Sequence, residues 1–357
     1  MRRLSILAAC LSMVCATAVA AERPVVYFEA TSFAHAEPLA VTEFIGEWGG
    51  PFHGGDAALT INRAELGVRY GGWRLSYIAR YDYFIDSHPD TAEAYYLSEN
   101  KLPFDAGRRY RAKINVNHIR AQGLKVSRRL MLRSDLSATL SVSYLAGRRL
   151  TQGKLSGHVT ALSDKDFDFD VNVDYVYSKD HLFDREVDPP SGNGYSIDLD
   201  LHWQPADRFA VSLTANDLVS RIVWRDAPFT EAVATSDTKR FDDDGFVTVI
   251  PTLSGVESNE DHVQVLWPVY RLSAVYRMMR NVRLVGEYLD TRVKKIPRLG
   301  AAISGRWGET SALWGTTTQA LTLRYRHGFL AASLTADKPD VTEARTLGLS
   351  VSLDLRW

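Results

Sequence analysis

The chain has 357 residues, of which 45% are hydrophobic and 24% charged. Without residues 1–20, which we predict to be removed, 40 Lys and Arg face 43 Asp and Glu, a net charge of −3. This balance gives no reason to expect nucleic acid as a partner.

The first twenty residues are predicted to be a cleaved signal peptide. Arg2 and Arg3 precede an uncharged apolar run that ends in Ala18-Val19-Ala20, the small-x-small form of a cleavage site. A membrane anchor is disfavoured because the run is short for a spanning helix. Lipoprotein processing at Cys10 would leave too short an apolar region before the cut. The only other cysteine, Cys15, also lies in the signal, so the mature chain is predicted to have neither disulfides nor cysteine metal sites.

Residues 21–56 are predicted to hold a weakly patterned first strand near 25–30 and then a long loop. After Ala57, segments of the sequence alternate between apolar and polar residues, as strands with two different faces do. Residues 73–86 are the clearest case: the face with Trp73 and Tyr83 is apolar and the other carries Arg74 and Arg80. Gly71-Gly72 predicts a tight hairpin before this strand.

The same alternation recurs along the middle of the chain. It predicts strands over 109–116, 136–144, 166–177 and 195–203, each with one apolar face that we expect to meet lipid. In 166–177 that face is formed by Phe167, Phe169, Val171, Val173, Tyr175 and Tyr177. No stretch of the mature chain is long and apolar enough for a membrane helix, so any insertion must occur through strands that close on themselves.

Short turns alternate with long polar connections along the chain. Turns are predicted at 71–72, 133–135, 163–165, 204–207, 279–281 and 327–328, and loops at 32–56, 86–108, 146–151, 179–194, 225–268, 292–318 and 338–344. Periplasmic turns and extracellular loops then alternate without conflict and give about fourteen strands, with both termini in the periplasm. The range is 12–16, since 246–253 and 300–307 also read as strands.

The last segment, Thr346 to Trp357, places six apolar residues on one face and small or polar residues on the other. An exported, cysteine-free chain of such strands ending in an aromatic residue resembles the Gram-negative outer-membrane β-barrels of porin-like size. The resemblance implies an all-β, antiparallel up-and-down barrel over residues 57–357, located in the outer membrane. It also implies that Leu353, Leu355 and Trp357 are recognised by the barrel-assembly machinery. It identifies an architecture and no substrate.

Charged residues on the inner face are expected to form two opposed walls of a pore. The basic wall consists of Arg74, Arg80, Arg109, Arg111 and Lys113; the acidic wall consists of Asp166, Asp168, Asp170, Asp174, Asp198, Asp200 and His202. Opposed walls create a transverse field that favours small polar solutes, so the leading hypothesis is a passive porin-like channel. The alternative is that these charges neutralise each other across a packed, closed interior.

Other activities find weaker support in the sequence. A lipid- or lipopolysaccharide-modifying enzyme would use His202 or His181 as its base, but no nucleophile motif or zinc-type His pair accompanies either residue. The 242–245 segment, three aspartates and a glycine, fails the EF-hand pattern and predicts a solvated loop tip. Five tryptophans could stack on sugars but more often anchor a barrel at the membrane interface: Trp203, Trp224, Trp267, Trp307 and Trp314.

The expected partners are outer-membrane lipid, lipopolysaccharide and the assembly machinery, with a homo-oligomer left open. No cofactor or metal is expected. A closed barrel that serves a surface or export complex is the third hypothesis. The chain is too short for a TonB-dependent transporter, and residues 21–56 are too polar to favour the N-terminal hatch of a fatty-acid transporter.

Overall fold

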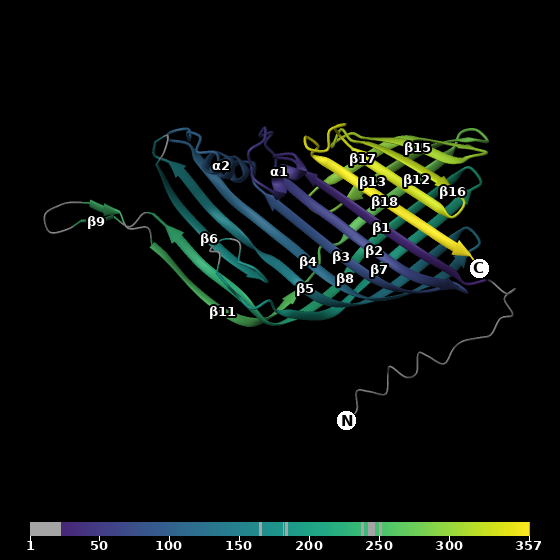
Figure 1. Cartoon of the computed structure of the whole chain (residues 1–357), viewed down its shortest axis with the longest axis horizontal. Helices are drawn as coiled ribbons and strands as arrows, with labels where there is room; N and C mark the ends of the chain where they lie inside the picture. The colour runs from purple at the N-terminus through teal and green to yellow at the C-terminus, as the bar shows by residue number, and fades with distance from the viewer. Residues whose placement is uncertain are drawn as a thin grey trace, which may run out of the picture.

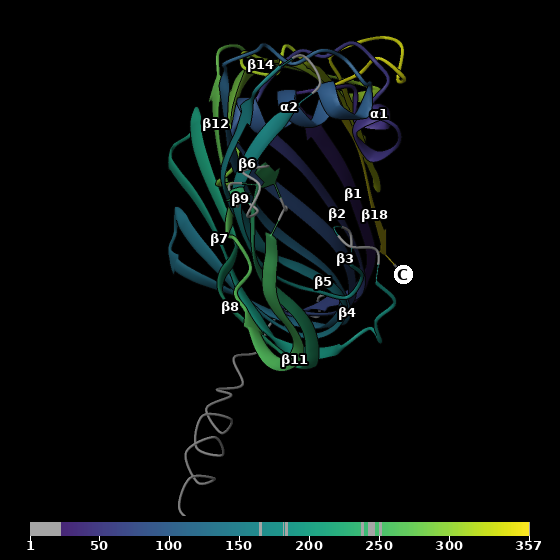
Figure 2. The same ribbon diagram turned by 90° about the vertical axis from the view of Figure 1, so that its left-hand side faces the viewer.

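The computed structural model describes residues 23–163, 166–180, 182, 185–236, 239–241, 247–249 and 252–356. Within these residues, fourteen antiparallel strands close into one barrel (Figures 1 and 2). They are β1 (Val25–Ala36), β2 (Ala57–Tyr70), β3 (Trp73–Ser87), β4 (Arg109–Arg133), β5 (Leu136–Ala161), β7 (Ser191–Ala206), β8 (Phe209–Thr235), β12 (Val269–Arg277), β13 (Val282–Asp290), β14 (Lys295–Gly305), β15 (Gly308–Gly315), β16 (Leu321–His327), β17 (Leu330–Ala336) and β18 (Thr346–Arg356).

The last strand closes the barrel against the first. β18 pairs with β1 over eleven residue pairs, from Val25↔Arg356 to His35↔Thr346. Every wall strand therefore has two neighbours, which leaves no free edge at the level of the membrane. The predicted barrel and its strand number are confirmed.

Alternation sets the two faces of the wall. Leu66, Tyr77 and Leu349 point outward and are 55%, 48% and 55% exposed, whereas the intervening side chains face the interior. The hairpin between β2 and β3 turns at Gly71 and Gly72, whose φ angles of 54° and 77° match a type I′ turn. This predicted turn is confirmed.

Two further strands of the large sheet lie outside the ring. β6 (Phe167–Tyr177) pairs with the far half of β5, and β11 (Thr252–Gln264) pairs with the far half of β8. β6 and β7 both lie between β5 and β8, β7 at their periplasmic halves and β6 at their extracellular halves. On the other edge of β8, β12 pairs with its periplasmic half and β11 with its extracellular half. Together with the long β4, β5 and β8, the two strands β6 and β11 form an extension that projects past the rest of the rim (Figure 1).

Several predicted boundaries were wrong because β5 is much longer than expected. The loop predicted at 146–151 lies inside β5, where Arg148 is an extra residue in a bulge opposite β4. Of the turn predicted at 163–165, residues 164–165 lie outside the described residues, and Ser163 follows the far end of β5, opposite to the turn at 133–135 and so on the extracellular side. In contrast, the loop predicted at 292–318 contains the wall strands β14 and β15. The predicted number of fourteen strands was right, although β6 lies outside the ring and β14 and β15 belong to it.

The remaining elements lie at the extracellular end. α1 (Val41–Ile45) and α2 (Pro89–Glu99) sit in the loops after β1 and β3, and β9 (Lys239–Phe241) and β10 (Val247–Val249) form a separate hairpin (Figure 1). Pro89 begins α2 and the His88 side chain accepts a hydrogen bond from the Asp90 backbone N–H at 3.2 Å, which caps the helix. Among the described residues, no helix is long and apolar enough to cross a membrane.

Candidate functional site

An ion network spans the barrel interior. Arg63 on β2 and Arg80 on β3 share Asp82 on β3 and Asp217 on β8, and β8 lies four strands from β3 around the ring. Arg63 Nη2 is 2.9 Å from both carboxylates, and Arg80 Nη1 is 2.6 Å from Asp217 Oδ1. The side chains of Asp82 and Asp217 are 1% and 0% exposed. The network therefore joins two separate sectors of the wall through buried, paired charges.

A local irregularity of β8 delivers Asp217 to this network. Ile197 pairs with Val219 but Leu199 pairs with Ala215. Between these two pairs β7 has one residue and β8 has three, so β8 carries a bulge of two extra residues. Within this bulge Asp217 adopts a φ of 57°, a left-handed conformation that aspartate tolerates better than most residues. Ser196 Oγ donates a hydrogen bond to the Asp217 carboxylate at 2.7 Å. The backbone N–H of Asp217 donates one to Asp198 Oδ1 at 2.9 Å. These bonds fix the carboxylate in the buried interior, within reach of Arg63 and Arg80.

Two further groups of inner charges are paired. Lys125 lies 3.1 Å from Asp198 and 3.6 Å from Glu65. On the other side of the barrel Glu287 accepts two hydrogen bonds from Arg324, one of them 2.7 Å long. Arg298 also lies 4.0 Å from Glu287, so two arginines share this carboxylate. Paired charges of this kind hold an interior together.

Above the ion network, towards the extracellular end, the interior is apolar. Seven buried side chains from β1–β3 on one wall and β12–β14 on the opposite wall form one cluster, here called the wall cluster: Phe33, Leu59, Ile61, Phe84, Val269, Leu289 and Ile296. The rings of Phe84 and Trp267 lie 6.2 Å apart, and the Arg298 guanidinium lies 5.3 Å from the Phe33 ring centre. Inward apolar side chains that touch across a barrel close it to water.

The last residue of β11 and the link to β12, residues 264–268, cross the interior beside this cluster; we call this segment the strap. Gln264 accepts a hydrogen bond from Trp224 Nε1 on β8 at 3.0 Å and donates one to the His118 carbonyl on β4 at 2.9 Å. Asn117 donates to the Val265 carbonyl at 2.8 Å. The strap is thus bonded to both β8 and β4.

The strap separates the wall cluster from a second one, here called the Trp224 cluster. Its buried members are Ile119, Ala121, Leu145, Leu150, Val176, Ile222, Trp224, Ala227 and Leu266. Leu266 of the strap belongs to the Trp224 cluster, whereas the next residue, Trp267, packs on the wall cluster. Gly147 and Gly192 flank the indole so closely that an added Cβ would lie 2.5 Å from the ring.

The extracellular loops are tied together at Glu37. Its carboxylate pairs with Lys294 and accepts hydrogen bonds from the backbone N–H groups of Asp56 and Ala57 at 3.0 and 3.2 Å. These loops border a hollow of about 250 Å³ with His35, His53 and Arg345 in its wall. Burial would raise the Glu37 pKa, but the bonds from Lys294 and Asp56 outweigh it and lower the pKa to about 2.

This lowered pKa makes the loop junction acid-labile. Because the folded pKa is below the usual 4.5, the stabilisation from Glu37 is complete above pH 4.5 and is lost as the pH falls towards 2. We expect the amides of Asp56 and Ala57 to exchange hydrogen faster at pH 2.5 than at pH 6 once intrinsic rates are corrected. Glu37→Gln should remove most of that difference, and equal protection of the native protein at both pH values would contradict the assignment.

The predicted basic wall is only partly in the membrane. Arg74 and Arg80 lie on the inner face of β3, as predicted, and Arg80 belongs to the ion network. Arg109, Arg111 and Lys113 also lie on the inner face, but at the far end of β4, twenty or more residues before Arg133 and the periplasmic turn. At about 3.3 Å per residue and a tilt near 40° they stand above the apolar band, so they do not line the membrane part of the barrel.

The predicted acidic wall is divided in the same way. Asp198, Asp200 and His202 face the interior from β7. Asp166, which precedes β6, and Asp168, Asp170 and Asp174 on β6 belong to the extension and face water there. The apolar face of β6 was expected to meet lipid; instead Val173, Tyr175 and Tyr177 are buried with Leu155 and Val187. Opposed charged walls are therefore replaced by paired charges in a packed interior.

The other candidate residues are placed as follows. Leu353 and Leu355 lie on the outer face of β18, with Leu355 45% exposed, whereas Trp357, His181 and 242–245 lie outside the described residues. His202 Nδ1 is 3.0 Å from Ser212 Oγ, but in the described part of the chain no carboxylate bonds to this imidazole. Trp203, Trp307 and Trp314 are 42%, 71% and 50% exposed on the outer surface, as interface anchors are, whereas Trp224 and Trp267 lie in the interior.

The outer surface decides the setting of the barrel. A belt of exposed apolar side chains surrounds the wall, with Trp73, Tyr276 and Tyr325 near the periplasmic turns and Tyr144 and Tyr288 further along the strands. An apolar belt between two rows of aromatic residues, around a polar interior and without a free edge, matches a bilayer and not water. The chain is an outer-membrane β-barrel protein.

No protein-family model and no curated protein matches this barrel. Similar solved structures include a deletion mutant of the TodX monoaromatic hydrocarbon channel, with 8% identity, a TM-score of 0.44 and coverage of 95% of this chain and 91% of that one. The Ralstonia pickettii toluene transporter TbuX has 9% identity and a TM-score of 0.32, with coverage of 95% of this chain and 90% of that one. A Pseudomonas aeruginosa FadL homologue has 8% identity and a TM-score of 0.35, with coverage of 93% of this chain and 88% of that one. At these TM-scores the fold assignment rests on the barrel's own strand pairing.

Proposed function

We propose that the barrel is an outer-membrane channel for small apolar or amphipathic molecules, held closed by its interior. The observation that carries this proposal is the wall cluster, in which side chains such as Phe33, Phe84 and Ile296 face the interior from opposite walls. A water-filled pore for polar solutes needs a polar lining throughout. This lining is apolar on the extracellular side and charged further in, so the expected preference for polar solutes is replaced by one for apolar solutes.

The order of the two layers suggests how a solute would pass. An apolar group entering from outside would displace wall-cluster side chains and meet a few polar groups, which is the usual composition of a small-molecule site. It would then reach the network of Arg63, Arg80, Asp82 and Asp217, which must separate before the solute can continue. In this proposal the wall cluster selects the solute and the ion network is the barrier.

Uptake by whole cells tests this proposal. Cells that express the barrel should accumulate the apolar dye 1-N-phenylnaphthylamine faster than cells without it, because intact lipopolysaccharide resists apolar compounds. Phe84→Asp, which places a charge in the wall cluster, should abolish the increase, whereas Phe84→Leu should keep it. Purified barrel in liposomes should give little swelling with arabinose.

Two results would refute the proposal. One is rapid arabinose entry without dye uptake, which would restore the porin hypothesis. The other is equal dye uptake by native and Phe84→Asp barrels that are present in the membrane in equal amounts.

A surface-complex role is a second candidate because β11 is an edge strand. Among the described residues it pairs with β8 alone, and residues 253–260 are exposed on both faces. A free edge of this kind can accept a strand from another protein. Val256→Pro should then prevent capture of a partner without changing dye uptake; equal capture by the native barrel and the variant would exclude β11 as the site.

A further inference from the structure

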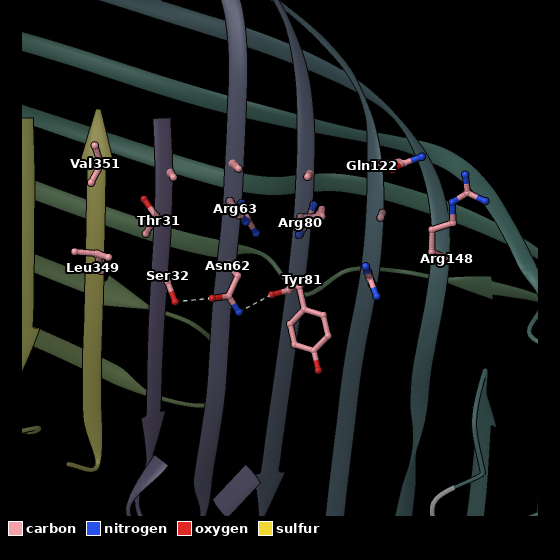
Figure 3. Close-up of a pocket in the computed structure, with 15 residues that line it drawn as sticks. Thr31, Ser32, Asn62, Arg63, Arg80, Tyr81, Gln122, Arg148, Leu349 and Val351 are labelled. Carbon is pink, nitrogen blue, oxygen red and sulfur yellow. Dashed lines mark hydrogen bonds between the residues drawn. The ribbon is translucent and has the colours of Figure 1, made fainter. Parts of the chain in front are cut away.

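A hollow of about 700 Å³ interrupts the outer surface of the barrel (Figure 3). Its floor is a row of small residues at one register position on three adjacent strands: Ala30, Ala64 and Ala79. Val351 on β18 continues the row at one end and Gln122 on β4 at the other. Bulky residues would fill this space, as they do elsewhere in the belt, so the alanines create a groove across five strands.

The groove faces lipid. Ala64 alternates with the outward Leu66, and Ala79 lies between Tyr77 and Tyr81, which are 48% and 38% exposed. Leu349, Ser32, Asn62 and Tyr81 border the groove on its extracellular side (Figure 3), and Ser32 donates a hydrogen bond to Asn62 at 2.6 Å. The alanine floor is apolar, which fits a hydrocarbon chain, and the polar residues lie on the side that faces the headgroups.

The groove runs obliquely through the outer half of the membrane. Ala79 lies six residues from the start of β3 and pairs with Gln122, and Tyr81 pairs with Arg120, so Arg120 lies one strand over and two residues nearer the extracellular end. With about 3.3 Å per residue, about 4.8 Å between strands and a tilt near 40°, Ala79 stands roughly 15 Å above the turn at 71–72 and Arg120 roughly 23 Å, against an apolar band about 25 Å tall. One end of the groove thus lies among acyl chains and the other near the outer edge of the band, where a long arginine side chain reaches the headgroups.

The headgroup end carries positive charge without a counter-charge. Arg120 and Arg148 line the hollow there, and Arg149 lies directly opposite Arg120 in the pairing of β4 with β5. All three are exposed, and none forms an ion pair or hydrogen bond with a side chain in the described part of the chain. Like charges on directly opposed strand positions repel each other, so an anion between them would relieve this cost.

We propose that this groove binds the lipid A part of one lipopolysaccharide molecule. The phosphate group would contact Arg120, Arg148 and Arg149, since guanidinium groups bind phosphate through two parallel hydrogen bonds. An acyl chain would lie over Ala79, Ala64 and Ala30. This role is independent of transport through the interior and gives the expected lipopolysaccharide partner a defined site.

Lipopolysaccharide that remains on the purified barrel measures this binding. Native mass spectrometry of barrel extracted from lipopolysaccharide-containing membranes should show one bound molecule. In the double variant Arg120→Ala/Arg148→Ala, retention should fall by at least about tenfold, because each charge-assisted contact that is lost contributes more than 1 kcal/mol. The matched control is Arg128→Ala/Arg225→Ala, which removes two other arginines of the outer face; Arg128 stacks on Trp73 and Arg225 pairs with Asp261.

A second variant tests the groove itself. Ala64→Phe keeps all three arginines but fills the floor, so it should also lose lipopolysaccharide while the heat-modifiable shift of the folded barrel stays normal on gels. Dye uptake should be unchanged in the arginine variant, which keeps this test separate from that of the channel.

Three outcomes would overturn the proposal. The first is unchanged retention in the arginine variant, and the second is an equal loss in the control variant. The third is equal binding of native barrel to phosphatidylglycerol vesicles and to lipopolysaccharide, which would mean that any anionic lipid suffices.

Discussion

Asp217→Asn is expected to turn a silent barrel into a conducting one. The substitution leaves Arg63 and Arg80 buried with Asp82 as their only carboxylate, and removing one partner of a buried ion pair typically costs about 3–5 kcal/mol. The two guanidiniums should then separate and admit water between β3 and β8. In planar bilayers we expect frequent current steps that favour anions, where the native barrel shows few or none.

Asp200→Asn is the matched control for this experiment. Asp200 lies on the same inner surface but accepts a hydrogen bond from Thr214 at 2.7 Å and has no ion pair with a described residue. It should leave the current near the native level. Equal conductance of the native barrel and the Asp217 variant would mean that the ion network is not the barrier.

Trp224→Ala is expected to cause the largest loss of stability. The indole is fully buried against neighbours on several strands, such as Ile119 on β4 and Leu150 on β5, and it holds Gln264 of the strap by a hydrogen bond. Removing a buried tryptophan typically costs about 3–5 kcal/mol, and Gln264 would lose a partner as well. The midpoint of unfolding by guanidinium chloride in detergent should therefore fall clearly.

Trp314→Ala provides the comparison for this variant. Trp314 is 50% exposed on the outer surface and should change the midpoint much less in detergent. If both variants shift the midpoint equally, the Trp224 cluster does not contribute to stability as the structure indicates. Faster proteolysis within the strap in the Trp224 variant alone would agree with the loss of its anchor.

The wall of the barrel could be predicted from sequence because alternation is a local property. Each residue of β3 or β18 shows its face through its neighbours two positions away, and Gly71-Gly72 marks the turn without tertiary information. The extension could not be predicted in this way. β6 alternates as a lipid-facing strand does, but its apolar face is covered by Val187 from a loop that has no such pattern.

The interior was less predictable for a different reason. Arg80 was recognised as an inner residue, but its partner Asp217 is displaced by a bulge and has a left-handed backbone, so its position follows no strand periodicity. Trp224 was read as an anchor because aromatic residues near strand ends usually are. The sequence feature that accompanies its burial is the pair Gly147 and Gly192, which leave room for the ring. Both glycines lie far from Trp224 in the chain, so no local pattern links them to it.

The unequal strand lengths have a consequence for the surrounding bilayer. β16 and β17 have 7 residues each, whereas β5 and β8 have 26 and 27. At the usual rise and tilt, seven residues reach only about 18 Å, less than the roughly 25 Å of hydrocarbon they must cross. Lipids beside β16 and β17 must therefore shorten, or the protein must lean toward that side, because either response reduces the mismatch. The membrane next to this protein should be thinner on one flank than on the other.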